Sequence, residues 1–389
     1  MQQLEYPMIV MAVLLQAAVS ATGPAAVENK DIVIVGRSID GARSSLAACI
    51  ARACPPDQEI KAAIILAARE FLAGDYVEAR RTLLASRGRN AKFAKNYPLQ
   101  VSDLHRALNR LSVLDGRLES ARLSAFDATD ALKSGLPADD PQILLQRLDT
   151  ARQLVRESRI VAAAEIFNDV AAKARKSGRY DVEAQALFRA ASVYAALGSV
   201  NPDYRPTARR WMTRIEQRAE PEFAEYRDGL ILLEAEIAAL KAKPANGGRD
   251  VRPLPAMAGA VLVHEPVVDF GTISGGRGPQ SGGNTDPEWA DVGFWVRPDG
   301  SVGDLHVLEQ SKSRPGSWLA AKTKAVADRR YAPLKGVADP RGLYRVERYS
   351  MVYPLIPSTE SRIPGRSTQG TLDMMDITTA RRPPPPDAD

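Results

Sequence analysis

A short motif returns along the chain at a constant interval of 42 residues, and this repeat constrains the fold more than any other feature. The equivalent positions are Tyr76, Leu118 and Ile160 and, three residues later, Ala79, Ala121 and Ala163. From residue 57 to 243 the apolar residues also follow a helical period, with no β-rich run. A single helix pair cannot bury its apolar face alone, so the repeat predicts stacked helix pairs around one continuous core.

The first unit, "AAREFLAGDYVEARRTLL" at residues 67–84, has an alanine in its first helix, then an aromatic residue, Gly-Asp-Tyr and a second alanine. This pattern resembles the tetratricopeptide-repeat (TPR) family, although 42 residues exceed the usual length of about 34. The resemblance implies a TPR-like solenoid over residues 57–243 whose concave face docks peptides or proteins. An irregular helical bundle without a groove is the alternative, and no groove residue can be identified from the sequence.

The N-terminus is apolar between residues 8 and 19, and small residues follow. Val19-Ser20-Ala21 has the pattern of a signal-peptide cleavage site, and the run is shorter than the about 20 residues of a membrane span. No Lys or Arg precedes the run, whereas Glu5 does. We predict a signal peptide over residues 1–21 and export to the periplasm. The alternatives are an inner-membrane anchor over residues 8–22, which would add membrane contact, and a buried helix.

The next segment, residues 22–56, contains both cysteines of the chain, Cys49 and Cys54. In an exported protein two close cysteines are more often bridged than free. Within one helix this spacing points the side chains apart, so a bridge requires the helix to end near Ala53, which Pro55 and Pro56 favour. We therefore predict a structural disulfide. No third cysteine or histidine is near enough in sequence for a metal site.

Two Gly/Pro-rich stretches between residues 244 and 290 are typical of a linker. The segment between them, "AVLVHEPVVDFG" at residues 260–271, is predicted to be an isolated strand or an extended strap. The polar, proline-rich residues 356–389 are predicted to be a disordered tail.

Residues 291–355 predict a small two-layer α+β unit of order strand, strand, helix, strand. "DVGFWVRP" and "SVGDLHVLEQS" flank Asp299-Gly300, a strong hairpin signal, and a bulge near Gly303 would keep Leu305 and Val307 in register. A helix over "PGSWLAAKTKAVADRR" and a strand over "LYRVERYSMVYPL" complete the unit. One helix covers only one face, and the open strand edges can accept an extended peptide or a second copy of the chain.

The order of a hydrophobic strand, a "PDG" turn, "VGDLHVLEQS", a helix, "YAPL" and a final strand resembles the C-terminal domain of the TonB energy-transducer family. The resemblance implies that the last strand binds extended segments of outer-membrane receptors by strand addition. The partner-binding edge would be Val346, Arg348, Tyr349, Ser350, Met351, Val352 and Tyr353. TonB's Ser/His-faced anchor and proline-rich spacer are replaced here by an apolar run without histidine and by the helical array, which favours an adaptor over an energy transducer.

The segment "DIVIVGR", at residues 31–37, resembles the recognition segment of TonB-dependent receptors. It either pairs with an open sheet edge, in the same or another chain, or forms a short strand or arm at the mature N-terminus.

Catalytic and metal-binding patterns are missing from the sequence. The three histidines, His105, His264 and His306, have no ligand partner at metal-binding spacing, and no phosphate loop, nucleophile elbow or HExxH occurs. We expect no enzyme and no cofactor. The net charge of +5, spread over 52 basic and 47 acidic residues, also argues against nucleic acid as a partner.

The sequence thus predicts a mainly α chain, with a TPR-like array followed by a TonB-like β-β-α-β unit. Two function classes fit this organisation. The first is a non-enzymatic periplasmic adaptor of TonB-type outer-membrane transport, which binds receptor segments through the sheet and another protein through the array. The second is an envelope or secretion scaffold whose C-terminal unit mediates self-association, such as a homodimer.

Overall fold

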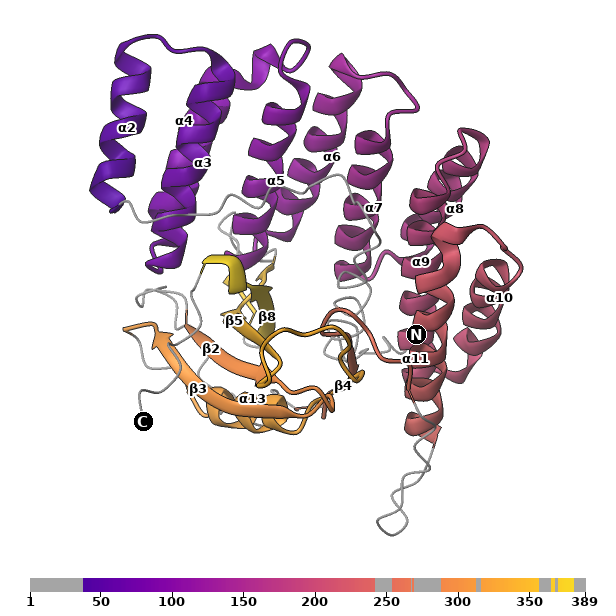
Figure 1. Ribbon diagram of the computed structural model, residues 1–389. Helices are drawn as coiled ribbons and strands as arrows, with labels where there is room; N and C mark the ends of the chain where they lie inside the picture. The colour runs from indigo at the N-terminus through magenta and orange to yellow at the C-terminus, as the bar shows by residue number, and fades with distance from the viewer. Residues whose placement is uncertain are drawn as a thin grey trace.

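The computed structural model describes residues 38–241, 254–266, 268, 288–312, 316–356, 365–367 and 370–380. Antiparallel helices form an array over the first part of the chain, and a sheet with its own helix lies against the helix ends along one side of that array (Figure 1). The helices of the array are α2 Ile39–Ala51, α3 Pro56–Leu72, α4 Tyr76–Asn90, α5 Pro98–Leu114, α6 Leu118–Gly135, α7 Pro141–Arg156, α8 Ile160–Lys176, α9 Tyr180–Val200, α10 Arg205–Glu216 and α11 Ala224–Lys241. The array begins one helix earlier than the sequence indicates, because Ala42 and Leu46 of α2 pack on α3.

Five turns between helices share one backbone geometry. Each has one residue of positive φ, between 49° and 84°, which is Ala53 after α2, Gly74 after α3, Gly116 after α5, Ser158 after α7 and Gly178 after α8. At each turn this residue donates its N–H to the carbonyl three residues earlier, and the next residue donates to the carbonyl five residues earlier. This is the Schellman arrangement, which satisfies the last carbonyls of a helix. Residues 74, 116 and 158 are 42 residues apart, so the first helix of each of the three repeat units ends in the same type of turn.

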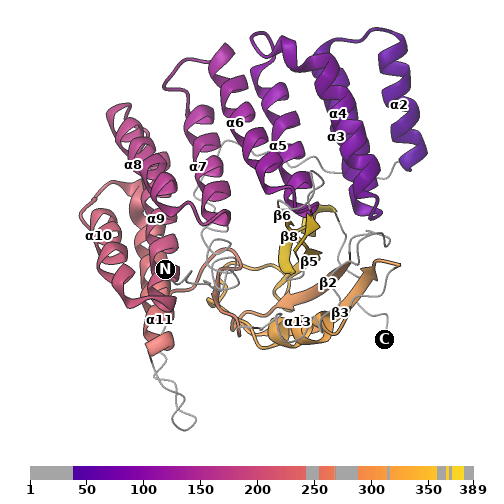
Figure 2. The same cartoon turned by 180° about the vertical axis from the view of Figure 1, so that it is seen from behind.

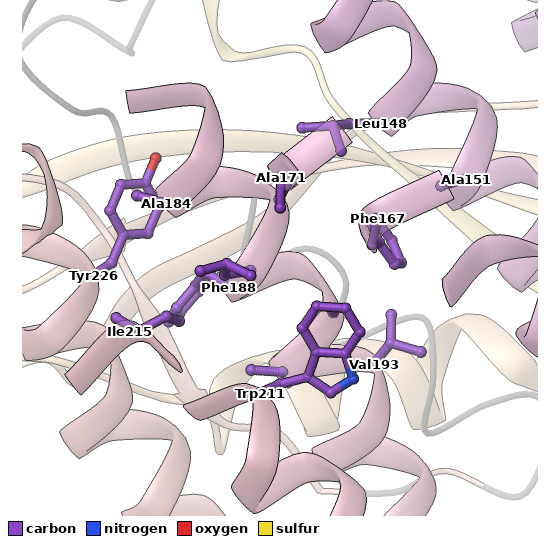
Figure 3. Packing of buried hydrophobic residues seen from close by; sticks show 14 of the residues in the cluster. Leu148, Ala151, Phe167, Ala171, Ala184, Phe188, Val193, Trp211, Ile215 and Tyr226 are labelled. Atoms are coloured by element: carbon purple, nitrogen blue, oxygen red, sulfur yellow. The ribbon is translucent and has the colours of Figure 1, made fainter. Parts of the chain in front are cut away.

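Small side chains let the paired helices approach one another. Ala79, Ala121 and Ala163 lie in α4, α6 and α8 and are at most 1% exposed. In the second half of the array, α7 to α11 each contribute to one apolar cluster. Figure 3 shows Leu148, Phe167, Phe188, Trp211 and Tyr226, one from each of these helices, turned toward a shared interior. The prediction of one continuous core is wrong in this respect, because the apolar residues of α3 to α6 form a separate cluster that includes residues of the sheet.

The predicted disulfide between Cys49 and Cys54 is confirmed, with the two Cα atoms 5.2 Å apart. As expected, α2 ends before the second cysteine, and Ala53 takes a φ of 49° that turns the chain toward α3. Pro56 then begins α3 at a first-turn position. The bridge joins the end of α2 to the start of α3.

The C-terminal sheet has four antiparallel strands in the order β3-β2-β5-β8. Their bounds are β2 Trp289–Val296, β3 Val302–Gln310, β5 Leu343–Val352 and β8 Thr371–Asp376. The helix α13, Trp318–Ala327, follows β3 as predicted. The bulge expected near Gly303 is also present, since the pairing of β2 with β3 shifts there and Asp304 has a φ of 50°.

Part of the predicted linker forms the expected strap along the sheet. Strand β1, Leu262–His264, pairs with β4, Arg330–Tyr331, and Met257 forms a bridge to Leu334. Leu232 of α11 packs with Val261 and Ala332, so the strap also joins the sheet unit to the end of the array. A second short pair, β6 Leu355–Ile356 with β7 Gly365–Arg366, follows β5.

The two faces of the sheet are both covered. Val292, Phe294 and Tyr349 pack with Trp318 and Val326 of α13 in one cluster. On the other face, four side chains pack into the core of α3, α4 and α5, namely Trp289, Val346, Val352 and Ile377. Figures 1 and 2 show the sheet held between α13 on one side and the ends of the array helices on the other. The sheet unit and the array thus form one packed body.

The predicted signal peptide at residues 1–21, the alternative anchor at residues 8–22 and the segment at residues 31–37 lie outside the described residues. Among the helices that the structure describes, none is both long and apolar enough to cross a membrane.

Candidate binding surfaces on the sheet and the array

The strand predicted to be the open edge is an interior strand. β5 pairs with β2 along one side and with β8 along the other. Of the predicted partner-binding residues, Val346, Arg348, Tyr349, Ser350, Met351 and Val352 are buried, and Tyr353 follows the strand half-buried. The prediction of an open edge at these residues is wrong, because the chain itself supplies the next strand.

That next strand, β8, comes from the segment predicted to be a disordered tail. Leu372 and Met374 pack toward α13, whereas Met375 and Ile377 pack toward the array, so the strand alternates between the two cores. Beyond the strand, the Thr378 hydroxyl accepts from the Val346 amide at 3.0 Å. The assignment of a disordered tail is therefore wrong for residues 370–380.

Arg348 fastens the sheet to the array at a fully buried point. Its guanidinium pairs with both carboxylate oxygens of Asp291 at 2.6 and 2.9 Å, and both side chains are 0% exposed. It also donates to the carbonyls of Phe71 and Leu72, at 2.5 and 2.8 Å. These carbonyls belong to the last turn of α3, where a cation is favoured by the helix dipole. The rings of Trp289 and Phe71 lie 3.8 and 4.9 Å from the guanidinium carbon.

The turn after α3 fits the same region of the sheet. A Cβ placed on Gly74 would lie 2.6 Å from the indole nitrogen of Trp289, so only glycine allows this approach. Tyr76, the first residue of α4, shares a buried hydrogen bond of 3.1 Å with the Ser350 hydroxyl. Burial raises the pKa of Tyr76, although the nearby Arg348 charge opposes the shift. Polar groups of this interface are therefore paired across it.

The equivalent turn after α5 contacts the residues that directly follow β5. The Gly116 carbonyl accepts from the Leu355 amide at 2.9 Å, and a Cβ on Gly116 would overlap the carbonyl oxygen of Tyr353. Arg366 donates to the carboxylate and to the carbonyl of Asp115, both at 3.1 Å. The turns after α3 and α5 thus both contact the sheet unit directly.

A buried ionic cluster joins the strap, α13 and β5 on the opposite face. Arg329 donates to Glu265 at 3.0 Å, to Glu347 at 2.7 Å and to Tyr349 at 2.9 Å, and Lys322 pairs with Glu265. Burial would raise the pKa of Glu347, but the charges of Arg329 and Arg345 and two hydrogen bonds together lower it. Burial raises the pKa of Tyr349 well above its ordinary value. Because every member is buried and paired, we assign this cluster a structural role.

β3 and β8 form the two edges of the sheet, and β3 is the more exposed of the two. In the described part of the chain β3 pairs with β2 alone, at the end of the strand order. Val307 and Leu308 are 42% and 40% exposed, which is high for large apolar residues. A row of backbone donors and acceptors on such an edge can pair with another strand.

The histidines lie apart from one another. His105 is buried in α5, with Nδ1 3.5 Å from Asp127, whereas His264 is in the strap. His306 in β3 contacts the Asp304 carbonyl at 2.8 Å and the Tyr344 hydroxyl at 3.4 Å. Among the residues that the structure describes, no group of three His, Cys, Asp or Glu side chains is placed to hold a metal ion.

No family model matches the chain, and no curated protein matches it at the significance threshold. Two solved structures are similar to it, both described as putative kinesin light chain nearly identical TPR-like repeats from Podosopora anserina. One is 16% identical over 46% of this chain and 87% of its own, with a TM-score of 0.36. The other is 15% identical over 55% of this chain and 100% of its own, with a TM-score of 0.37.

At these scores the similarity carries no argument about function. The TPR-like character of the array rests on this chain's own repeated helix pairs and turns. The resemblance of the sheet unit to the TonB C-terminal domain stays a prediction.

Proposed function

We propose that this chain is a non-enzymatic protein-binding adaptor that is exported to the periplasm and serves TonB-type outer-membrane transport. Its partner contributes an extended segment, which pairs with the outer edge of β3. The observation that carries the proposal is the position of β3 at the end of the strand order, with Val307 and Leu308 exposed beside it. Strand addition there would extend the sheet by main-chain hydrogen bonds.

The choice of β3 follows from the packing of the other strands. β5 is paired on both sides, and β8 is held by β5 and by charged side chains of the array. The array gives the sheet a rigid support through Arg348 and the turns at Gly74 and Gly116. A rigid edge loses little conformational entropy when a partner strand binds, which favours affinity.

Export is supported by the disulfide between Cys49 and Cys54, because such bridges persist in oxidising compartments. The mass of the chain purified from the cell envelope tests this part. A mature N-terminus near Thr22 supports export with cleavage, whereas an intact Met1 would favour the anchored alternative.

Peptide binding tests the adaptor. The probe is a fluorescently labelled peptide of sequence DIVIVGR, and its anisotropy is measured against the full chain. Saturable binding is expected, and the double variant Val307→Lys/Leu308→Lys should abolish it because charges on an edge strand oppose pairing. The control is the double variant Leu123→Lys/Val161→Lys, which places the same two charges on apolar residues of α6 and α8 that are 56% and 74% exposed. Binding by wild type and control but not by the β3 double variant supports the proposal.

Two results would overturn it. One is the lack of saturable binding at millimolar peptide, or binding that the β3 double variant leaves unchanged. The other is a concentration-dependent dimer in sedimentation that the β3 double variant breaks, because β3 would then serve self-association.

A further inference from the structure

A cavity of about 200 Å³ lies between α5, α6 and α7, in the array. Its lining is polar except for one alanine and consists of Arg106, Asn109, Arg110, Ala125, Gln146, Asp149, Arg152, Gln153 and Arg156. We call it the arginine cavity. It differs from the apolar contacts that hold neighbouring helices together, because four of its nine lining residues are arginines.

Two aspartates accept most of the ion pairs around the arginine cavity. Asp149 lies 3.1 Å from Arg189 and 3.6 Å from Arg152. Asp373 of β8 does not line the cavity but contacts two of its arginines from the sheet, at 2.9 Å from Arg110 and 3.3 Å from Arg156. The Arg110 guanidinium also donates to the Met374 carbonyl at 3.1 Å. The chain therefore already uses these arginines to bind a carboxylate.

The positive charge exceeds the negative charge at this place. The fifth arginine of the group, Arg106, pairs with Asp103 at 3.2 Å. Five guanidinium groups thus face three carboxylates, those of Asp103, Asp149 and Asp373, which leaves an excess of two positive charges. Nearby, Arg122 pairs with Glu157 at 2.8 Å and lies 3.9 Å from the exposed Glu119, and none of these three residues lines the cavity. Burial, together with the nearby charges of Arg110 and Arg152, lowers the pKa of Arg156 to about 10.

The geometry of these groups suits an oxyanion. The planar fork of a guanidinium matches two oxygens of a phosphate, and several such groups around one cavity are typical of phosphoryl recognition. One water molecule takes about 30 Å³ in the liquid, so the cavity has room for a tetrahedral anion with a few waters.

From this excess of two charges in a polar cavity, we propose that the arginine cavity binds a tetrahedral dianion, as free phosphate or as the phosphoryl group of a small phosphate ester. Arg152 serves as the principal anion contact. The ion pair that the structure gives for it, with Asp149, is longer than the other three ion pairs made by Asp149 and Asp373. Asp373 lies beside the bound anion and weakens its binding by like-charge repulsion. This inference does not depend on strand addition at β3.

The experiment measures the melting temperature of the full chain during titration with inorganic phosphate at neutral pH, with sodium chloride at matched ionic strength as the reference. A ligand that binds only the native state raises the melting temperature in a saturable way. Arg152→Gln should weaken phosphate binding by about tenfold, since a hydrogen bond to a charged group contributes about that factor. Asp373→Asn should strengthen it several-fold. Glycerol phosphate is titrated in parallel, and the tighter of the two ligands distinguishes a free anion from an ester.

The matched control is Arg147→Gln, on the same helix but paired with Asp169 outside the cavity lining. It removes the same charge and should leave phosphate affinity within about twofold of wild type, because Arg147 does not line the cavity and its charge is paired with Asp169. The proposal is overturned if phosphate and phosphate ester shift the melting temperature no more than chloride does. It is also overturned if Arg147→Gln weakens binding as much as Arg152→Gln, or if Asp373→Asn weakens it.

Discussion

Replacing Arg348 with methionine should detach the sheet from the array, because Arg348 of β5 donates two hydrogen bonds across to the end of α3. A buried ion pair with Asp291 of β2, inside the sheet, holds its guanidinium in place. Methionine keeps much of the apolar volume between Trp289 and Phe71 but removes the charge and every donor. Asp291, which is 0% exposed, loses both hydrogen bonds that it accepts from Arg348. The carbonyls of Phe71 and Leu72 lose the same donor.

The size of the effect follows from these contacts. Removing one partner of a buried ion pair costs about 3–5 kcal/mol of unfolding free energy. The partly buried Leu72 carbonyl also loses its donor, which costs about 1 kcal/mol more, whereas the Phe71 carbonyl keeps the hydrogen bond from the Gly74 amide. We expect Arg348→Met to lose at least about 4 kcal/mol. The double variant Arg348→Met/Asp291→Leu should recover about 2 kcal/mol of this loss, because the buried carboxylate that has lost its guanidinium is then absent.

Urea unfolding read by two probes measures this loss. Trp289, Trp295 and Trp318 lie in the sheet unit, so tryptophan fluorescence reports mainly on the sheet, whereas far-ultraviolet circular dichroism reports mainly on the helices. The two transitions should coincide in the wild type, and in Arg348→Met the fluorescence transition should move to lower urea. The control is Arg81→Met, whose ion pair with Glu78 on α4 has side chains 68% and 35% exposed and contributes about 1 kcal/mol or less. A loss in Arg348→Met no larger than in this control would refute the reasoning.

Two further predictions concern a helix turn and the buried ionic cluster. Ser158 is exposed and has a φ of 58°, where the equivalent repeat positions hold Gly74 and Gly116, so Ser158→Gly should stabilise the chain by about 0.5–1 kcal/mol. Thermal unfolding checks this, and equal or lower stability would contradict it. The native pKa of Glu347 lies below its ordinary value of 4.5, so its stabilising contribution is present above about pH 4.5 and is lost as the pH falls through the native pKa. In Glu347→Gln the free energy of unfolding should therefore fall less steeply as the pH is lowered than it does in the wild type. An equally steep fall in the variant would contradict the lowered pKa of Glu347.

The helical array was predictable because its signals are local. The 42-residue interval places Gly74, Gly116 and Ser158 at equivalent turns, and the helical period of apolar residues identifies the helices between them. The disulfide was predictable for the same reason, since Pro55 and Pro56 end α2 beside the two cysteines.

The sheet's surroundings were not predictable, because they depend on contacts between distant segments. The segment "TLDMMDI" appears polar by itself, and Asp373 becomes favourable only beside Arg110 and Arg156 of the array. A charged residue such as Arg348 on a strand ordinarily indicates a solvated face, whereas here that face meets the carbonyl end of α3. The arginines of α5 and α7 gave no signal either, since only the packing of the helices brings them to one cavity.

The central claim is that turns of the array contact the sheet and stabilise its position. It is tested most directly by comparing Gly116→Ala with Gly178→Ala. Both glycines have a φ of 69° and follow a helix in the same way, so the backbone strain of about 1 kcal/mol is common to both. Only Gly116 faces the sheet, where a Cβ would overlap the Tyr353 carbonyl; at Gly178 nothing lies within 4 Å. The account predicts that Gly116→Ala lowers the free energy of unfolding by about 1–3 kcal/mol more than Gly178→Ala. Equal losses in the two variants would contradict it.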